Sequence, residues 1–200
     1  RYGLDPIRYF LLRQVPFGND GDFSHQAMVH RLNGDLANDF GNLCQRVLSM
    51  IFRNCNGNIP PSHELTEGDI AFVDGIAASI EELRKLMDAQ SFNQALELIW
   101  RHVGNANRYV DEQAPWELRK SDPVRMETVL YTLSEAIRNL ALLSSPFMPD
   151  AMARIFDQMG VAATDRTFTH LGRAHGLAEG TRLSGKPQPI FPRFVEEEGA

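Results

Sequence analysis

Residues 24–55 read SHQAMVHRLNGDLANDFGNLCQRVLSMIFRNC. Large apolar side chains recur here at intervals of three and four residues, which is the period of a helix with one buried face. Ser24 offers an N-cap at the start, and the stretch NGNIPP at residues 56–61 ends the pattern. The segment therefore predicts a long helix from Ser24 to about Cys55. Its expected core residues are Met28, Leu32, Leu36, Phe40, Leu43, Val47, Leu48, Ile51 and Phe52.

Further helices are predicted on both sides of this segment. Upstream, Asp5 can cap a helix and Pro6 suits its first position, and the apolar run that follows ends at Pro16. Residues 17–22 have the composition of a loop. Downstream, the same helical period returns in four segments separated by Pro, Gly and Ser. These predicted helices run from Thr66 to Met87, from about Ser91 to Gln113, from Asp122-Pro123 to the break at Ser144-Ser145-Pro146, and from Asp150 to Gln158.

The fold class that follows is all-α, an antiparallel helical bundle with an irregular C-terminal tail. The tail, residues 161–200, holds eight Gly or Pro residues and no long apolar period. We expect three segments: residues 1–22 as a linking helix and loop, residues 23–160 as the bundle, and residues 161–200 as the tail.

Charge and composition exclude several classes of protein. The chain has 26 Asp and Glu against 20 Lys and Arg, so its net charge of -6 argues against binding nucleic acid through a broad basic surface. Residues 56–100 carry two basic and eight acidic side chains, a net charge of -6, so this part should face away from any polyanion. No GxGxxG, HExxH or GxSxG motif is present, so a binding module is favoured over an enzyme.

The two cysteines are predicted to be free thiols in a reducing compartment, which points to the cytoplasm. Cys44 and Cys55 would lie roughly 16 Å apart on one helix, which is too far for a disulfide. Neither belongs to a spacing typical of a zinc site, and no apolar run is long enough to cross a membrane.

The polar side of the long helix is the first candidate site. Asn42 and Arg46 are one turn apart, so their side chains project together, and Arg53 follows on the same side. An amide can contact a base edge with a donor and an acceptor, and a guanidinium can bind a base edge or a phosphate. Arg53 is expected to contact a phosphate. The alternative is an ordinary solvated helix face.

The two tryptophans suggest different roles. Trp100 lies on the apolar stripe of its helix and is predicted to be part of the core. Pro115 is expected to interrupt the helical pattern at Ala114, which leaves Trp116 outside any apolar period. A ring displayed at a helix end could stack on an unpaired base, or it could simply cover the end of the bundle.

Several segments, in order along nearly the whole chain, resemble the methionyl-tRNA synthetase family of bacterial type. The strongest is residues 106–116, ANRYVDEQAPW. The others are YGLDP at 2–6 with RYFLLR at 8–13, NDGDFS at 19–24, NGDLAND at 33–39, GNL at 41–43, PFMP at 146–149 and KPQPIFPR at 186–193.

The resemblance implies a helical anticodon-binding domain that recognises the CAU anticodon of methionine tRNAs. The family's anticodon-reading Asn and Arg match Asn42 and Arg46, and its base-stacking Trp matches Trp116. Nothing in the chain resembles the family's HIGH motif, zinc-bearing insertion, KMSKS loop or C-terminal dimerisation extension. The expected partners are a methionine tRNA and the catalytic domain of the same polypeptide, where ATP and zinc would be bound.

The chain itself is therefore expected to hold no cofactor, to lack catalytic activity and to be a monomer. The alternative from another functional class is a stand-alone helical module that binds protein.

Overall fold

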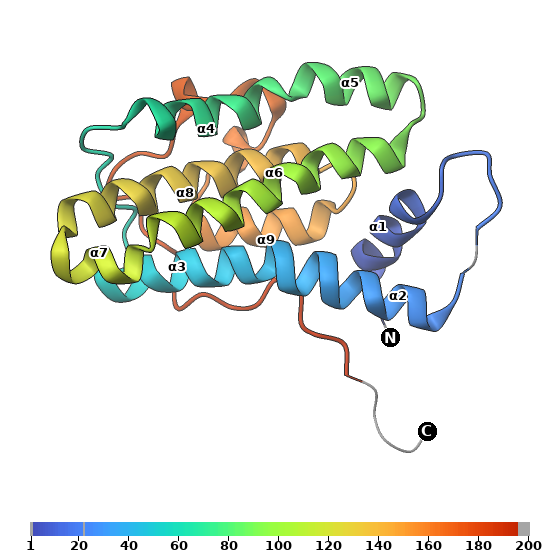
Figure 1. Ribbon diagram of the computed structural model, residues 1–200, viewed down its shortest axis with the longest axis horizontal. Coiled ribbons are helices and arrows are strands. Elements are labelled where there is room, and N and C mark those ends of the chain that lie inside the picture. Colours follow the sequence, from blue (N-terminus) through green and yellow to red (C-terminus); the bar gives the residue numbers. More distant parts are fainter. Residues whose placement is uncertain (1, 22, 196–200) are drawn as a thin grey trace.

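The computed structural model describes residues 2–21 and 23–195, which form a helical bundle (Figure 1). Arg1, Asp22 and residues 196–200, which belong to the predicted segments 1–22 and 161–200, lie outside the described residues. The helices are α1 (Leu4–Gln14), α2 (His25–Arg31), η1 (Leu32–Gly41), α3 (Asn42–Asn54), α4 (Glu67–Ala78), α5 (Ile80–Asp88), α6 (Phe92–Gln113), α7 (Pro115–Ser121), α8 (Pro123–Ser144) and α9 (Pro149–Met159). Three single turns follow, η2 (Ala163–Asp165), η3 (Phe168–His170) and η4 (Arg173–His175).

The bundle is built around α8. Every residue from Thr132 to Ser144 is buried, because α3, α4, α6, α7 and α9 all pack against this helix. Because α8 is covered on all sides, its polar side chains are buried as well, among them Glu135, Arg138 and Asn139. The long helices alternate in direction along the chain, so the predicted antiparallel all-α bundle is confirmed (Figure 1).

The predicted long helix is also present, and it consists of three consecutive helical segments, α2, η1 and α3. Ser24 caps α2 by accepting a hydrogen bond from the Ala27 amide at 3.1 Å. The helix continues without a break through η1 into α3, yet η1 is a π-helix, with hydrogen bonds to the fifth residue back. A Cβ on Gly41 would lie 2.8 Å from the Leu36 carbonyl oxygen, so this wide turn requires glycine at its end.

Other expectations need correction. Phe52, predicted as a core residue, is 40% exposed near the end of α3. The segment predicted as one helix from Thr66 is two, because Ser79 separates α4 from α5 and its hydroxyl donates to the Ile76 carbonyl. The helical pattern breaks at Ala114, as expected, but Pro115 and Trp116 then begin a short helix, α7, that was not predicted. Trp100 is only half-buried and packs at the edge of the core.

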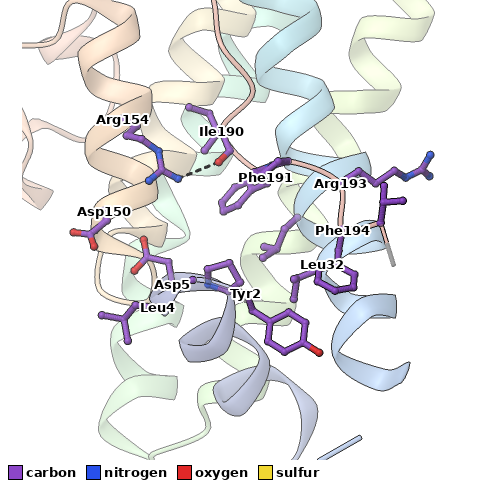
Figure 2. Close-up of a pocket in the computed structure, with 15 residues that line it drawn as sticks. Tyr2, Leu4, Asp5, Leu32, Asp150, Arg154, Ile190, Phe191, Arg193 and Phe194 are labelled. Atoms are coloured by element: carbon purple, nitrogen blue, oxygen red, sulfur yellow. Dashed lines mark hydrogen bonds between the residues drawn. The ribbon is translucent and has the colours of Figure 1, made fainter. Parts of the chain in front are cut away.

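Asp5 does not cap its own helix. It lies inside the first turn of α1, whose N-cap is Gly3, and its Oδ2 accepts a hydrogen bond of 2.6 Å from the Ala151 amide. Asp5 therefore caps α9 from a distant part of the chain. Figure 2 shows it beside the start of α9, in a cavity of 500 Å³ where Arg154 donates to the Ile190 carbonyl and holds the tail.

The tail is attached to α8 by a buried polar network. The Glu135 carboxylate accepts two hydrogen bonds from the Arg138 guanidinium and one from the Leu177 amide. Arg138 also donates to the carbonyls of His170 and Gly172. The side chains of this Glu–Arg pair are 1% and 2% exposed, so it lies in the protein interior.

The acidic residues 56–100 include helices α4 and α5. Figure 1 shows α4 and α5 along one side of the bundle and α3 along the other, with α6 and α8 between them.

Cys44 and Cys55 are free thiols. Burial, together with the nearby Glu127 carboxylate, raises the pKa of Cys55 to about 11. Within the described part of the chain, no helix is both long and apolar enough to cross a membrane.

Candidate nucleic-acid interface

Trp116 is displayed at the corner between α6 and α7. Ala114 ends α6 in the left-handed conformation, with φ of 41°, and Pro115 occupies the first turn of α7 with its ring buried. This reversal directs Trp116 outward, where 42% of its surface is exposed. A large ring that remains this exposed at a fixed corner is suited to stacking.

The corner is braced by a polar network between three helices. Arg125 of α8 donates to the Gln113 side chain at 2.7 Å and to the Asp69 carboxylate at 2.9 Å. Asp69 also accepts from the Tyr109 hydroxyl and closes a capping box with Thr66 at the start of α4. The last residue of α6 is thereby tied to α4 and α8.

Asp69→Asn is expected to reveal this network through the pH dependence of stability. Burial alone would raise the pKa of Asp69, but hydrogen bonds from Arg125, Tyr109 and Thr66 outweigh it and hold the pKa well below its usual range. A lowered pKa stabilises the folded state above the ordinary value near 4, and this contribution is lost as the pH falls. We expect a loss of about 2 kcal/mol in unfolding free energy at pH 7.

The measurement is urea denaturation of both proteins at pH 7 and pH 3, where the difference should shrink. Asp74→Asn, on the same helix but paired with Arg173 in solvent, is the control, with an expected effect of about 1 kcal/mol or less. A difference between parent and Asp69→Asn that stays constant with pH would contradict the assignment.

Arg46 lies beside Trp116. Its guanidinium carbon is 5.5 Å from the centre of the tryptophan ring, within the range of a cation–π contact. Its Nη2 also donates to Asp111 of α6 at 2.7 Å, and both side chains remain partly exposed. Arg46 thus joins α3 to the α6–α7 corner at the surface.

A pocket of 360 Å³ lies between α3 and α7, and we call it the α3–α7 pocket. Arg46, Arg53 and Trp116 all line it, so the structure brings these three predicted residues together. Val47, Val110, Leu130 and Leu133 line its apolar part, and Gln45, Ser49, Met50 and Pro115 complete it. A flat ring could enter between apolar side chains and meet a cation at the rim.

Asn42 borders a second, neighbouring depression. This depression of 510 Å³ lies between η1, the start of α3 and the tail, and Gln45 lines it as well as the α3–α7 pocket. Asn42 is exposed there, one turn before Arg46. The tail contributes Arg193, whose guanidinium donates to the Asn38 side chain at 3.3 Å.

Sequence reasoning missed Gln45, Asp111 and Arg193 as neighbours of the predicted residues. Asp111 and Arg193 belong to the quoted motifs at 106–116 and 186–193, which is the signal that could have found them. Among the residues that the structure describes, no cluster of His, Cys, Asp and Glu could hold a metal ion.

Comparison with known proteins assigns the family. A family model described as the anticodon binding domain of methionyl tRNA ligase matches residues 59–200, which is more than half of the chain. This chain belongs to the methionyl-tRNA synthetase family. A second family model, for class I tRNA synthetases of the methionine type, matches residues 1–48 of this synthetase-family chain.

Relatives of known sequence agree with this assignment. The methionine–tRNA ligase of Mesorhizobium japonicum is 48% identical over 100% of this chain, and that of Brucella suis is 49% identical over 99%. This member of the methionyl-tRNA synthetase family spans only 38% of the length of either relative.

Solved structures show the same fold. The apo form of Mycobacterium tuberculosis methionyl-tRNA synthetase superposes with a TM-score of 0.93 at 42% identity, covering 98% of this chain and 40% of that one. The same enzyme in complex with methionyl-adenylate gives 0.91 at 43% identity, covering 96% and 38%. Residues 59–200 are therefore the anticodon-binding domain of the methionyl-tRNA synthetase type.

Proposed function

We propose that this chain binds the CAU anticodon loop of methionine tRNAs through Asn42, Arg46 and Trp116. The observation that carries the proposal is that Arg46 lines the same pocket as Trp116, a residue of the anticodon-binding domain. Anticodon loops offer unpaired bases, and proteins read such bases by stacking and by contacts to their edges.

Each residue has a distinct role in this proposal. Trp116 stacks on an unpaired base, whose identity matters little for stacking. Asn42 and Arg46 read base edges, for which Arg46 exchanges its exposed contact with Asp111 for the base. Arg53, at the end of α3 on the same pocket, contacts a phosphate. The net charge of -6 is compatible with this mode, because specificity needs only a few well-placed groups.

The test is the affinity of this chain for a methionine tRNA anticodon stem-loop and for a stem-loop with a changed anticodon. Asn42→Ala and Arg46→Ala should each weaken cognate binding by about 1–3 kcal/mol and reduce the preference for CAU. Trp116→Ala should weaken binding by about 1–3 kcal/mol with less dependence on base identity. Arg53→Ala should weaken binding to both loops and lower the salt dependence.

Matched controls lie elsewhere on the bundle. Asn105→Ala and Arg84→Ala remove exposed side chains of the same types from α6 and α5, and both should bind as the parent does. If Asn42→Ala and Arg46→Ala also bind both loops as the parent does, the polar side of α3 is only solvated surface. A stand-alone protein-interaction module would show no anticodon preference in the parent.

The further roles concern the longer relatives. We infer that the activation of methionine with ATP, and any zinc site, belong to the part of those proteins that this chain does not cover. We also propose that the chain acts in the cytoplasm as a monomer, next to the catalytic domain, and has no catalytic activity of its own.

A further inference from the structure

The π-helix η1 ends immediately before Asn42. The Asn42 backbone amide donates to the carbonyl of Ala37, five residues back, and also to that of Asp39. The wide hydrogen-bonding pattern thus extends up to the residue whose side chain begins the polar side of α3. A change of η1 from π to α hydrogen bonding would rotate α3 about its axis, because the two kinds of helix differ in their rotation per residue, which is about 100° in an α-helix.

Two side chains of α6 bond to the backbone carbonyls of η1. The Trp100 indole donates to the Asp35 carbonyl at 3.2 Å, and the Asn107 amide donates to the Asp39 carbonyl at 3.1 Å. A long run of π-helix is rare in proteins, so it depends on contacts beyond its own backbone hydrogen bonds. Donors from a neighbouring helix therefore favour the π conformation over the α conformation here.

Asn107 is held firmly in its own helix. Its side-chain amide also donates to the Val103 carbonyl, one turn earlier in α6. One turn later, Asp111 accepts the hydrogen bond from Arg46. Two successive turns of α6 therefore hold two successive points of the neighbouring helix, the backbone before Asn42 and the guanidinium of Arg46.

We infer that Asn107 is a positioning residue for anticodon binding, which holds the end of η1 so that Asn42 and Arg46 face the surface beside Trp116. The inference rests on the proposed function and adds to it a residue outside the binding surface. Gly41 serves the same turn from inside, because the close approach of the Leu36 carbonyl leaves no room for a side chain.

The test compares Asn107→Ala with Asn105→Ala, which removes the same amide from an exposed position of α6. Hydrogen exchange of the backbone amides from 39 to 43 should become about tenfold faster in Asn107→Ala, since the opening free energy falls by roughly one hydrogen bond. Cognate stem-loop affinity should fall about fivefold to tenfold. Asn105→Ala should change neither measurement.

A double-mutant cycle separates positioning from a general loss of stability. In a background that carries both Asn42→Ala and Arg46→Ala, Asn107→Ala should weaken binding less than twofold, because both residues that it positions are already absent. An equal loss in both backgrounds would overturn the inference. So would exchange and affinity in Asn107→Ala that match Asn105→Ala.

Failure of the inference is distinguishable from failure of the proposed function. If the parent binds cognate and changed loops equally, the proposed function is wrong whatever Asn107 does. If the parent discriminates and Asn107→Ala discriminates equally well with parent-like affinity, only the positioning role is wrong. Asn107→Ser, whose shorter hydroxyl cannot span the same gap, makes the same comparison should Asn107→Ala fold poorly.

Discussion

Arg138→Met is expected to lower the free energy of unfolding by about 3–5 kcal/mol, because it leaves the Glu135 carboxylate buried without its cation. Methionine fills a similar volume, so the loss of charge and of hydrogen bonds dominates over the loss of packing. Arg138 also holds the carbonyls of His170 and Gly172, so the variant should release the tail from α8. Chemical denaturation measures the first effect and limited proteolysis near residue 170 the second.

The chain contains a matched control for this variant. Glu81 and Arg84 form an ion pair with the same spacing of three residues, but their side chains are 70% and 58% exposed. Arg84→Met should therefore change the unfolding free energy by about 0.5 kcal/mol or less. Equal effects of the two substitutions would show that the Glu135–Arg138 pair is not the buried brace described above.

Trp100→Ala should lower the unfolding free energy by about 3 kcal/mol, the lower end of the range for removing a buried aromatic side chain. The ring packs against Tyr9, with ring centres 4.5 Å apart, and against Phe40 at 6.2 Å. The lower end applies because part of the ring remains exposed. Trp116→Ala should lower it by about 1 kcal/mol or less and act chiefly on RNA binding.

Denaturation curves of the two tryptophan variants rank these effects directly. Trp100→Phe separates packing from hydrogen bonding, since it keeps an aromatic ring and removes the donor to the Asp35 carbonyl. If Trp116→Ala proves the more destabilising of the two alanine variants, then Trp116 serves to cover the end of the bundle, and its assignment as a stacking residue fails.

The parts of the fold that were predicted correctly are those with a strong local signal. The apolar periods of α6 and α8 and the Asp122-Pro123 start of α8 depend on residues close in sequence, so their bounds agree closely with the structure. The π-helix was not predictable in this way. Two of its carbonyls accept hydrogen bonds from Trp100 and Asn107, which are more than 60 residues away in the sequence. The spacing of apolar residues within the segment cannot indicate such distant partners.

The same distinction applies to the candidate site. Helix geometry alone predicted that Asn42 and Arg46 project together. The structure places them one turn apart on α3, where they line two neighbouring depressions. That Arg46 lies against Trp116 depends on the packing of α3 beside α7, so only the resemblance to a known family could connect these residues beforehand. The left-handed conformation of Ala114 likewise escaped prediction, because that conformation is uncommon for residues other than glycine.

The tail residue Phe194 and the η1 residue Asn33 exchange two hydrogen bonds although 161 positions separate them. Closing so long a loop is entropically unfavourable until the intervening chain is compact, so we expect this contact to form late in folding. On a ribosome the tail is also the last of these segments to emerge. We therefore expect the tail to complete the wall of the depression beside Asn42 only after α3 has packed into the bundle. The tail residues of this wall are Pro189, Phe191, Pro192 and Arg193.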